Sequence, residues 1–457
     1  MIVLSGKRVA VVGLGASGLA ASRLAMARGA RLTLTDMKCE DALGPDARAV
    51  IAKLAQAGAR LSLGGHGEAE IDRQDLVVVS PGVPTFAELL AAEARQVPVI
   101  GEVELAVRAL SGETATAPVV AVGGTNGKST TTSLLGAILE GAGQRAFVGG
   151  NLGEPLSDHV DEPWDSVVLE VSSFQMERVE AFKPKVSILL NVTADHLDRY
   201  PSFDAYAHAK GNAFARQTED DVAIIPYGDE VCLREARRGR ARIVTFGRGG
   251  DIDVSTNAIV DQRSGASFAR ASLQVSGEHN AVNAAAAIGA ALALGVSHEH
   301  IRAALGSFRG LPHRMVLVAE IDGVRYYDDS KGTNVGAAVT ALRGLSEPRA
   351  VLIAGGREKG GSYAPLTEAL REKGRAVVLL GEARAAMAGA FDGAVPVHPV
   401  ASLADAVQLS RALAQPGDAV LLSPACSSYD MFRDYKHRGD EFVREVSALQ
   451  GATRSGS

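Results

Sequence analysis

The sequence has 457 residues, of which 46% are hydrophobic and 22% are charged, as in an ordinary globular protein that folds in water. Its formal net charge of −6 argues against general affinity for nucleic acid or for anionic membranes. Cys39, Cys232 and Cys426 are far apart and form no CxxC pair, which favours a reducing compartment over a disulfide framework or a zinc site. The longest apolar run, residues 284–296, is shorter than the roughly 20 residues that a membrane span needs. We therefore expect a cytoplasmic protein that binds neither nucleic acid nor membrane.

The first block of the chain begins like a dinucleotide-binding unit. An apolar strand, Val9–Val12, runs into Gly13-x-Gly15-x-x-Gly18, an alanine-rich helix follows, and a second strand ends on Asp36. In dinucleotide-binding proteins such an acidic residue holds a ribose hydroxyl. A third strand ends in the tight turn Ser80-Pro81-Gly82, at the strand end where open α/β sheets place ligands. A glycine fingerprint alone leaves NAD and other diphosphate ligands open.

A polar segment, Ser111–Pro118, is predicted to be a linker, and a phosphate-binding loop opens the second block. Gly124-Thr125-Asn126-Gly127-Lys128-Ser129-Thr130 lies between an apolar strand and a helix. In such a loop the backbone N–H groups and the helix N-terminus bind anionic oxygens, Lys128 adds a mobile positive charge, and the Ser129 hydroxyl can ligate Mg²⁺. Val122 replaces the first glycine of the strict GxxxxGK[ST] pattern, so a glycine-rich turn with a chance lysine is the alternative. The context favours ATP over NAD as the reacting nucleotide.

Three further residues of the second block are candidates for the chemistry. Glu170 ends an otherwise apolar strand, where a carboxylate near a phosphate loop suits Mg²⁺. A capped or surface carboxylate is an equally good interpretation of Glu170 taken alone. His196 follows an apolar strand beside two aspartates, a setting in which histidine is more often structural than a ligand. Lys210 looks by itself like any lysine of a helix.

The second block closes with an alanine-rich helix, Asn280–Gly295, and Gly310–His313 is a second candidate hinge. In the third block, strands are predicted at Ala350–Ala354, Ala376–Leu380 and Ala419–Leu422, each followed by small residues and a helix. Strands and helices alternate throughout, which indicates an α/β protein with mostly parallel sheets, and the length suits about three domains. We place these domains at residues 1–112, 113–311 and 312–457. The residues alone predict a multidomain enzyme that uses ATP and Mg²⁺, and they leave its substrate open.

Several motifs along the chain resemble those of the Mur amino-acid ligases in order and spacing. They are Gly124–Thr130, Glu170–Gln175, Asn191–His196, Gly277–Asn283, Leu311–Arg314, Asp329–Lys331 and Ser423–Ser428. The combination of Ser172–Gln175, Asp195–Pro201 and Ser423–Ser428 resembles the branch of this family that adds D-glutamate. The resemblance covers essentially the whole chain.

The resemblance implies a three-domain fold and a ligase reaction. The N-terminal Rossmann-like domain would hold the UDP of a sugar substrate in place of NAD, the central P-loop ATPase-like domain would bind ATP on a mostly parallel sheet, and the C-terminal Rossmann-like domain would bind the amino acid. The implied reaction adds D-glutamate to UDP-N-acetylmuramoyl-L-alanine through an acyl phosphate, in peptidoglycan precursor synthesis. It would use ATP, Mg²⁺ at two sites and a CO₂-derived carbamate on Lys210. We expect the enzyme to be a monomer.

The resemblance also implies a role for individual residues, position by position. The implied catalytic residues are Lys128, Glu170, His196 and Lys210. The implied ATP-binding residues are Gly124, Thr125, Asn126, Gly127, Lys128, Ser129, Thr130, Asn280, Asn283, Arg314 and Asp329. The implied UDP-substrate residues are Gly15, Ala16, Ser17, Asp36, Ser80, Pro81, Gly82, Asn151 and His196, and those for D-glutamate are Lys331, Thr333, Lys359, Ser428 and Tyr429. The implied metal ligands are Ser129, Glu170, His196 and Lys210 as its carbamate.

Four other functions compete with this one. A sister ligase that adds another amino acid, or a folylpolyglutamate synthase, would share the mechanism, but Ser172–Gln175, Ser423–Ser428 and the N-terminal glycine fingerprint argue against both. An NAD-dependent oxidoreductase would need an acid–base histidine in the first block, where His66 lies in a glycine-rich loop and is a poor candidate. A non-catalytic, ATP-gated binding protein would be expected to lack Glu170 or Lys210, and both are present.

Overall fold

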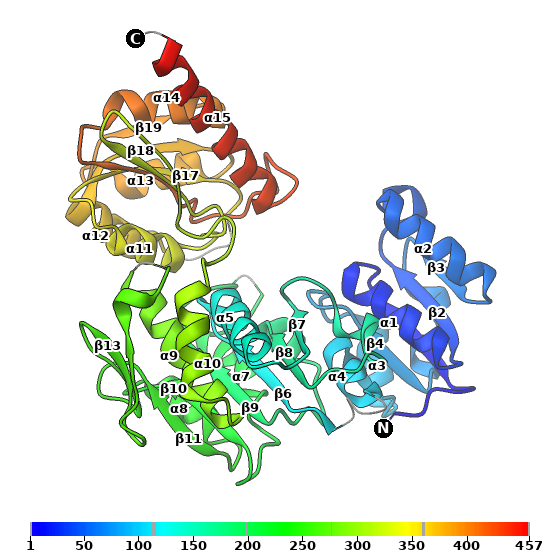
Figure 1. Ribbon diagram of the computed structural model, residues 1–457. Coiled ribbons are helices and arrows are strands. Elements are labelled where there is room, and N and C mark those ends of the chain that lie inside the picture. Colours follow the sequence, from blue (N-terminus) through cyan, green and yellow to red (C-terminus); the bar gives the residue numbers. More distant parts are fainter. Residues whose placement is uncertain (1, 111–115, 198, 276, 359–361, 456–457) are drawn as a thin grey trace.

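The chain folds into three α/β domains, and the computed structural model describes residues 2–110, 116–197, 199–275, 277–358 and 362–455 (Figure 1). The predicted fold class is confirmed. The first five residues of the predicted linker, and with them the boundary at residues 112–113, lie outside the described residues. The three sheets are mostly parallel, so their loops at the carboxyl ends of the strands are gathered at one edge of each sheet.

The N-terminal domain is a five-stranded, fully parallel sheet in the order β3-β2-β1-β4-β5. Its strands are β1 (Arg8–Val12), β2 (Arg31–Asp36), β3 (Arg60–Leu63), β4 (Leu76–Val79) and β5 (Val99–Gly101). Its α-helices are α1 (Ala16–Ala27), α2 (Pro45–Gln56), α3 (Ala87–Ala94) and α4 (Glu102–Ala109). The central strands β1 and β4 are almost wholly apolar and buried because helices cover both faces of the sheet. The three strands predicted here are confirmed to within one residue at each end.

The central domain is a nine-stranded sheet in the order β14-β13-β12-β11-β10-β9-β6-β8-β7. Its strands are β6 (Val119–Gly123), β7 (Ala146–Gly150), β8 (Ser166–Glu170), β9 (Val186–Leu189), β10 (Val222–Pro226), β11 (Arg242–Phe246), β12 (Ile252–Val254), β13 (Ala258–Asp261) and β14 (Ser267–Ala269). Its α-helices are α5 (Lys128–Gly141), α6 (Ser173–Met176), α7 (Phe203–Gly211), α8 (Glu230–Ala236), α9 (Glu278–Ala293) and α10 (His298–Ser307). Among the described strands of this sheet, only β13 runs opposite to the others, so its pairings with β12 and β14 are antiparallel. Helices α5 and α9 pack side by side against the sheet around a core of small and branched apolar side chains.

The C-terminal domain is a six-stranded sheet in the order β15-β16-β20-β17-β18-β19, parallel apart from the edge strand β15. Its strands are β15 (Val316–Ile321), β16 (Val324–Asp328), β17 (Ala350–Gly355), β18 (Gly374–Leu380), β19 (Val397–Pro399) and β20 (Ala419–Leu422). Its α-helices are α11 (Val335–Gly344), α12 (Ala364–Lys373), α13 (Arg384–Phe391), α14 (Leu403–Leu413) and α15 (Tyr435–Ser455). Separate apolar clusters fill the two faces of this sheet, so the domain has its own core.

The N-terminal and central domains share a continuous apolar cluster, which includes Val103 and Leu105 of α4 and Leu156 of the central domain. The first turn of α4 carries two buried carboxylates that accept backbone hydrogen bonds from the central domain. Glu102 accepts from the Ser157 N–H at 2.9 Å, and Glu104 accepts from the Ala181 N–H at 2.8 Å. These two domains are therefore joined by apolar packing and by hydrogen bonds to buried carboxyl groups.

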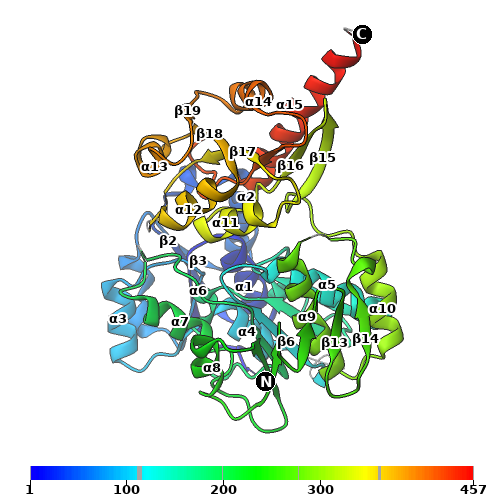
Figure 2. The same cartoon turned by 90° about the vertical axis from the view of Figure 1, so that its left-hand side faces the viewer.

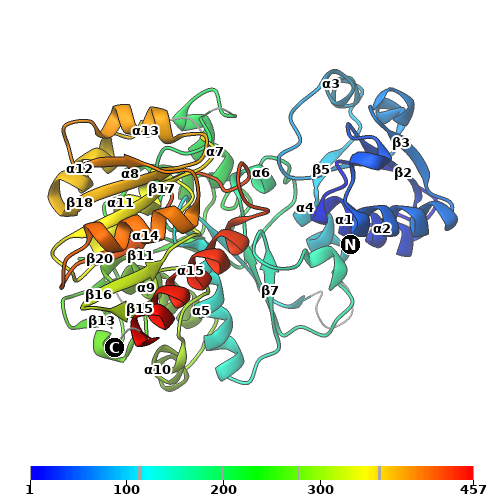
Figure 3. The ribbon, with the colours of Figure 1, turned by 90° about the horizontal axis from the view of Figure 1, so that it is seen from above.

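The C-terminal domain lies over the central domain, and α11 and α12 form its underside (Figure 2). Viewed from above, the N-terminal domain stands to one side of this pair (Figure 3). Helix α11 contacts α9 across the boundary. None of the helices that the structure describes combines the length and apolar character that a membrane crossing requires. All three cysteines are free thiols, with Cys232 and Cys426 buried and Cys39 exposed.

Candidate active site between the central and C-terminal domains

A cavity of about 750 Å³ lies where the central domain meets the C-terminal domain. It brings together fifteen of the residues predicted from the sequence, from segments up to two hundred residues apart. They are Thr125, Asn126, Gly127, Lys128, Ser129, Thr130, Asn151, Glu170, His196, Asn280, Asn283, Arg314, Asp329, Lys331 and Thr333. The cavity is rich in polar side chains and large enough for a nucleotide and part of a second substrate.

The phosphate loop connects β6 to α5 and has the backbone that its glycines predict. Gly127 has a φ of 85°, and a Cβ on it would lie 2.3 Å from the Oδ1 of Asn283, so a side chain there would displace the Asn283 amide. Lys128 begins α5, and its Nζ donates to the carbonyl of Thr125 at 2.8 Å. The lysine therefore curls over its own loop, above the N–H groups of the first helical turn.

Asn191 holds this loop in shape, although its role was not predicted. Its side-chain oxygen accepts from the Asn126 N–H at 2.9 Å, and its Nδ2 donates to the Asn126 carbonyl at 3.1 Å. The sequence feature that could have indicated Asn191 was its place at the start of the motif Asn191–His196, shortly after a buried strand. A side-chain amide matches both backbone groups of one residue, which explains why an asparagine stands there.

Glu170 ends β8 inside the cavity and is nearly inaccessible to solvent. Its Oε1 accepts a hydrogen bond of 2.6 Å from Asn151, whereas Oε2 is buried with no hydrogen-bond partner among the described residues. Burial opposes ionisation of this carboxyl, but attraction to Lys128 and hydrogen bonds from its neighbours outweigh burial and lower the pKa of Glu170. The result is a buried carboxylate with one open oxygen beside a phosphate loop, which is the donor that a hard cation prefers.

His196 lies at the cavity wall in a left-handed backbone conformation, with a φ of 56°. Its N–H donates to Oδ1 of Asp195 at 3.0 Å, and its ring meets Phe174 edge to face at 4.9 Å between centroids. A left-handed conformation is strained for a residue with a side chain, and here the neighbouring contacts hold it. The loop thus presents the imidazole to the cavity from a fixed backbone.

Lys210 lies behind the phosphate loop and is not part of the cavity lining. It is buried on α7, its Nζ donates to the Gly124 carbonyl at 2.8 Å, and the same nitrogen lies 4.5 Å from the centre of the Tyr206 ring. Burial favours the neutral amine and repulsion from Lys128 acts in the same direction, so the pKa of Lys210 lies well below its usual range. A lysine in this environment differs from the ordinary helix lysine that its sequence context suggested.

The C-terminal domain completes the cavity with residues that follow the hinge. Arg314 donates to the Ser129 hydroxyl at 3.0 Å, across 185 residues of sequence. Asp329 is buried at the end of β16 and accepts from the Ser423 hydroxyl at 2.7 Å; burial raises its pKa to about 7. Lys331 lies with its Nζ 3.8 Å from the centre of the Tyr435 ring. The family resemblance implied Tyr429 as a ligand residue and gave Tyr435 no role.

The other residues predicted for D-glutamate lie in the loop between β20 and α15 or outside the described residues. Ser428 is buried and Tyr429 is 66% exposed, and of the described residues neither lines the cavity. Lys359 lies outside the described residues. The assignment of these three residues therefore stays a prediction.

In the N-terminal domain, the residues predicted for the UDP group meet at the carboxyl ends of β1, β2 and β4. Asp36 accepts from the Leu14 N–H at 2.7 Å, and the Ser80 hydroxyl donates to the Gly13 carbonyl at 2.6 Å. A Cβ on Gly18 would lie 1.9 Å from that same carbonyl, so the third glycine permits α1 to approach the strand ends. Gly15 caps α1, with Ala16 and Ser17 in its first turn, and Pro81 and Gly82 follow Ser80. This edge has the form of a diphosphate-binding turn.

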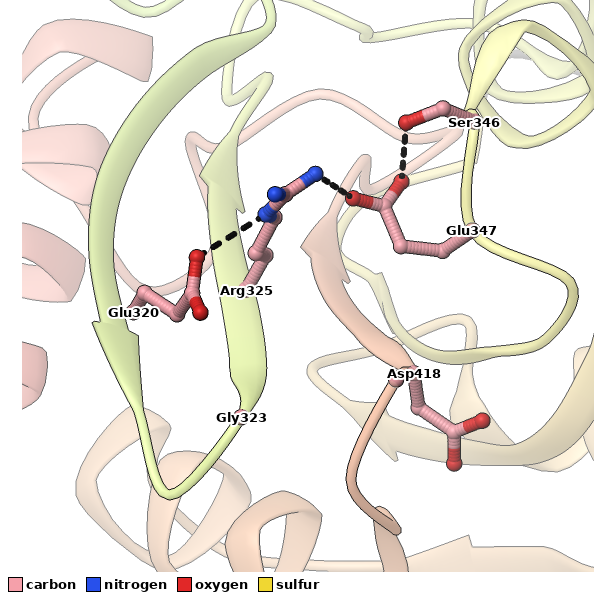
Figure 4. Close-up of a pocket in the computed structure, with 7 residues that line it drawn as sticks. Glu320, Gly323, Arg325, Ser346, Glu347 and Asp418 are labelled. Carbon is pink, nitrogen blue, oxygen red and sulfur yellow. Dashed lines mark hydrogen bonds and ion pairs between the residues drawn. The ribbon is translucent and has the colours of Figure 1, made fainter.

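No group of three or more histidine, cysteine, aspartate or glutamate side chains suited to a metal ion occurs among the described residues. A second cavity, of about 390 Å³, lies at the amino ends of β16, β17 and β20, opposite the edge that carries Asp329 (Figure 4). Arg325 lies there between Glu320 and Glu347, at 3.0 and 3.1 Å, so its charge is already paired with two carboxylates. The chemistry that the sequence predicts therefore belongs to the larger cavity.

Family models match each domain in turn. Residues 7–101 match the Mur ligase MurD-like N-terminal domain, residues 122–291 the Mur ligase middle domain, and residues 313–426 the Mur ligase glutamate ligase domain. Curated relatives match nearly end to end. The UDP-N-acetylmuramoylalanine–D-glutamate ligase of Desulfosudis oleivorans is 44% identical, with 97% of each chain covered, and that of Anaeromyxobacter dehalogenans is 45% identical, with 96% of this chain and 97% of the relative covered.

Solved structures share the fold at low identity. The UDP-N-acetylmuramate–alanine ligase MurC of Thermotoga maritima has a TM-score of 0.61 at 20% identity, covering 97% of this chain and 100% of that one. The MurF ligase of Thermotoga maritima in complex with ADP has a TM-score of 0.62 at 17% identity, covering 91% of this chain and 95% of that one. Three matching domains in the right order and near-complete alignment with curated relatives show that the chain belongs to the UDP-N-acetylmuramoylalanine–D-glutamate ligase family of the Mur ligases.

Proposed function

We propose that this protein joins D-glutamate to the L-alanyl carboxyl of UDP-N-acetylmuramoyl-L-alanine, with cleavage of ATP to ADP and phosphate, in the cytoplasmic synthesis of peptidoglycan precursors. The observation that carries the proposal is the junction of the phosphate loop, through Ser129, with Arg314 of the C-terminal domain inside one cavity. An enzyme that activates one substrate with ATP and then adds a second needs such a junction between two domains.

The chemistry follows from the poor reactivity of a free carboxylate. Displacing its oxygen directly would expel oxide, so the carboxylate first attacks the γ-phosphorus of ATP and releases ADP. The acyl phosphate that results has phosphate as a leaving group. The amine of D-glutamate then attacks the acyl carbon, loses a proton, and phosphate departs. Both steps bring anions together, so electrostatic neutralisation dominates catalysis.

The ATP phosphates belong to the loop of Gly124–Thr130 in this proposal. Lys128 neutralises their charge, and the N–H groups at the start of α5 donate to their oxygens at the helix N-terminus. Asn280, Asn283, Arg314 and Asp329 line the same cavity and would hold the rest of the nucleotide. Arg314 reaches the loop from the C-terminal domain, so ATP would be enclosed by both domains.

The donor set fits Mg²⁺. The open, buried Oε2 of Glu170 and the hydroxyl of Ser129 are oxygen ligands, and His196 on the cavity wall would serve a second ion. When bound, Mg²⁺ would withdraw charge from the phosphate oxygens. Too few acidic groups gather among the described residues to hold a metal without the phosphates, which agrees with a metal that arrives with the nucleotide.

Lys210 fits a carbamate. The neutral amine is the form that reacts with CO₂, and burial, which lowers the pKa of Lys210, favours that form. A carbamate would convert a cation into an anion with two oxygen donors behind the phosphate loop. Repulsion between Lys210 and Lys128 would then become attraction.

The two remaining substrates approach from opposite sides. The N-terminal turns of Gly15–Ser17 and Ser80–Gly82, with Asp36, would hold the UDP group, and Asn151 and His196 would face its alanyl end. D-Glutamate carries two carboxylates and therefore suits Lys331 and Thr333, together with Lys359, Ser428 and Tyr429. One chain supplies all of these residues, so we propose that a monomer is active, which light scattering during gel filtration would test.

The test is ATP-dependent phosphate release with UDP-N-acetylmuramoyl-L-alanine and Mg²⁺, with one amino acid added at a time. We expect release with D-glutamate and none with L-glutamate, L-lysine or diaminopimelate. Release with another amino acid would keep the mechanism and reassign the C-terminal pocket. Absence of release with every amino acid would refute the proposal.

A further inference from the structure

The side-chain amide of Asn334 makes hydrogen bonds on both sides of the boundary between the central and C-terminal domains. It precedes α11 in the C-terminal domain, and its Oδ1 caps that helix by accepting from the Ala337 N–H at 2.8 Å. Its Nδ2 donates to Oδ1 of Asn126 at 3.1 Å and to Oδ2 of Asp195 at 3.2 Å. Both acceptors belong to the central domain. One amide thus fixes the start of a C-terminal helix to two central loops.

The two acceptors stand on parts of the central domain that the reaction uses. Asn126 lies within the phosphate loop, and its backbone is held on both sides by Asn191. Asp195 precedes His196 and accepts that residue's N–H at 3.0 Å. The hydrogen bonds of Asn334 therefore end on rigid, cavity-lining loops.

The packing around this contact is close. Gly336 lies in the first turn of α11, and a Cβ on it would lie 3.2 Å from the Nδ2 of Asn126. The loop that carries Lys331 and Thr333 leads directly into Asn334. The position of Asn334 on the central domain consequently sets how far these two residues stand from the phosphate loop.

Helix capping alone does not explain why this residue is an asparagine. Aspartate and serine cap helices about as well, and the α14 cap in the same domain is Ser402. An aspartate at position 334 could still accept from Ala337, but it would have no N–H to donate and would set a carboxylate against Asp195. The amide is required by the contacts across the boundary.

We propose that Asn334 is a positioning residue that latches the C-terminal domain onto the phosphate loop and so places the D-glutamate site against the ATP site. This inference rests on the proposed function. The latch acts through the loop of Lys331 and Thr333, so its loss weakens use of D-glutamate. The UDP-substrate groups lie on the N-terminal and central domains, which pack together independently of Asn334.

The experiment compares Asn334→Asp with Ser402→Ala, a cap variant of the same domain outside the cavity. Steady-state phosphate release is measured while each substrate is varied, and thermal unfolding is recorded for each variant. For Asn334→Asp we expect a Tm no lower than that of Ser402→Ala, a KM for the UDP substrate within about twofold of the wild type, and a kcat/KM for D-glutamate lowered by about tenfold or more, since a tenfold loss corresponds to one or two hydrogen bonds. Ser402→Ala keeps wild-type kinetics.

The swap Asn334→Asp with Asp195→Asn restores one amide–carboxylate pair in reversed order. The amide introduced at position 195 would still accept the His196 N–H and would donate to the new carboxylate at position 334. We expect the double variant to use D-glutamate better than Asn334→Asp alone, which a purely helix-capping role would not produce.

Three results would overturn the latch: wild-type kinetics in Asn334→Asp, a fall in Tm that accounts for the lost activity, or equal losses for all three substrates. A double variant no better than Asn334→Asp would also count against it. Failure of the proposed function is distinguishable because the wild-type enzyme would then release no phosphate in response to D-glutamate.

Discussion

The side-chain nitrogen of Lys210 donates a 2.8 Å hydrogen bond to the carbonyl oxygen of Gly124, which fixes α7 to the first glycine of the phosphate loop. The contact is buried and lies over the face of Tyr206. Burial of a lysine without a paired carboxylate is costly unless the amine is neutral. Burial therefore favours the neutral form of this amine next to the phosphate loop, and this defines a direct test.

Lys210→Ala should be nearly inactive and should regain part of its activity when formate or acetate is added, because a small carboxylate can occupy the space that the proposed carbamate would fill. The measurement is phosphate release against carboxylate concentration, with exposed Lys53→Ala on α2 as the control that keeps its activity. Inactivity without rescue would leave the lysine with a structural role at Gly124 and would remove the support for a carbamate.

Lys128→Ala should lose phosphoryl transfer by about a hundredfold or more, since one well-placed charge at a transferring group is worth that much. The variant should still fold, because the hydrogen bond of the Lys128 Nζ to the Thr125 carbonyl stays within the phosphate loop. Isotope exchange involving the labelled phosphate groups of ATP measures phosphoryl transfer, and melting curves measure stability, so the two effects are separated. Turnover near the wild-type rate would mean that the loop does not hold the reacting phosphates.

Gly18→Ala should destabilise the N-terminal domain and raise the KM for the UDP substrate. Its Cβ would meet the Gly13 carbonyl at 1.9 Å and the Ser80 hydroxyl at 2.5 Å, so α1 has to move away from the strand ends. Such overpacking costs about 1–3 kcal/mol. Gly44→Ala is the matched control, because a Cβ there meets nothing within 4 Å. Equal stability and equal KM in the two variants would show that α1 does not need this close approach.

Asp329→Asn should change the pH dependence of stability. Burial favours the protonated carboxyl and raises its pKa from 3.8 to about 7 in the folded protein. The folded state therefore binds this proton more tightly than the unfolded chain, and its contribution to stability is present below pH 3.8 and is lost as the pH rises toward 7. An amide does not titrate and can still accept from Ser423.

Relative to the wild type, the free energy of unfolding of Asp329→Asn should therefore increase between about pH 4 and pH 7 and should stay higher above pH 7. Urea denaturation across that range measures this difference. The Lys53→Ala protein serves as a control whose difference from the wild type stays constant with pH. A difference that is also constant for Asp329→Asn would show that this carboxyl is ionised in the folded protein at all these pH values.

The elements that could be predicted from the sequence are those whose structure is decided by neighbouring residues. Val119–Gly123 followed by Gly124–Thr130 forms a strand, a loop and a helix, because the apolar run, the glycines and the hydroxyl-rich helix start act over a few residues. The same holds for β1 and its turn. Parallel strands then gather such turns at one edge of a sheet, which is why Asp36 and Ser80 could be expected beside Gly13.

The roles that could not be predicted from the sequence belong to residues whose contacts are far away along the chain. Asn334 carries a sequence pattern that fits any helix cap, and its partners Asn126 and Asp195 lie 208 and 139 residues away. The sequence around Lys210 is that of a surface lysine. The contact of Tyr435 with Lys331 forms only when α15 packs on the loop, so no local pattern indicates it.

The three α/β domains, the phosphate loop and the polar strand ends could be predicted from the sequence, because they follow from local backbone preferences and from the alternation of apolar and polar residues. The contact of Arg314 with Ser129, the burial of Lys210 and the pairing of strand ends across the domain boundary become visible in the folded protein alone. Burial and cross-domain hydrogen bonds are set by the packing of whole domains, and a local pattern of residues does not encode the depth at which a side chain finally lies.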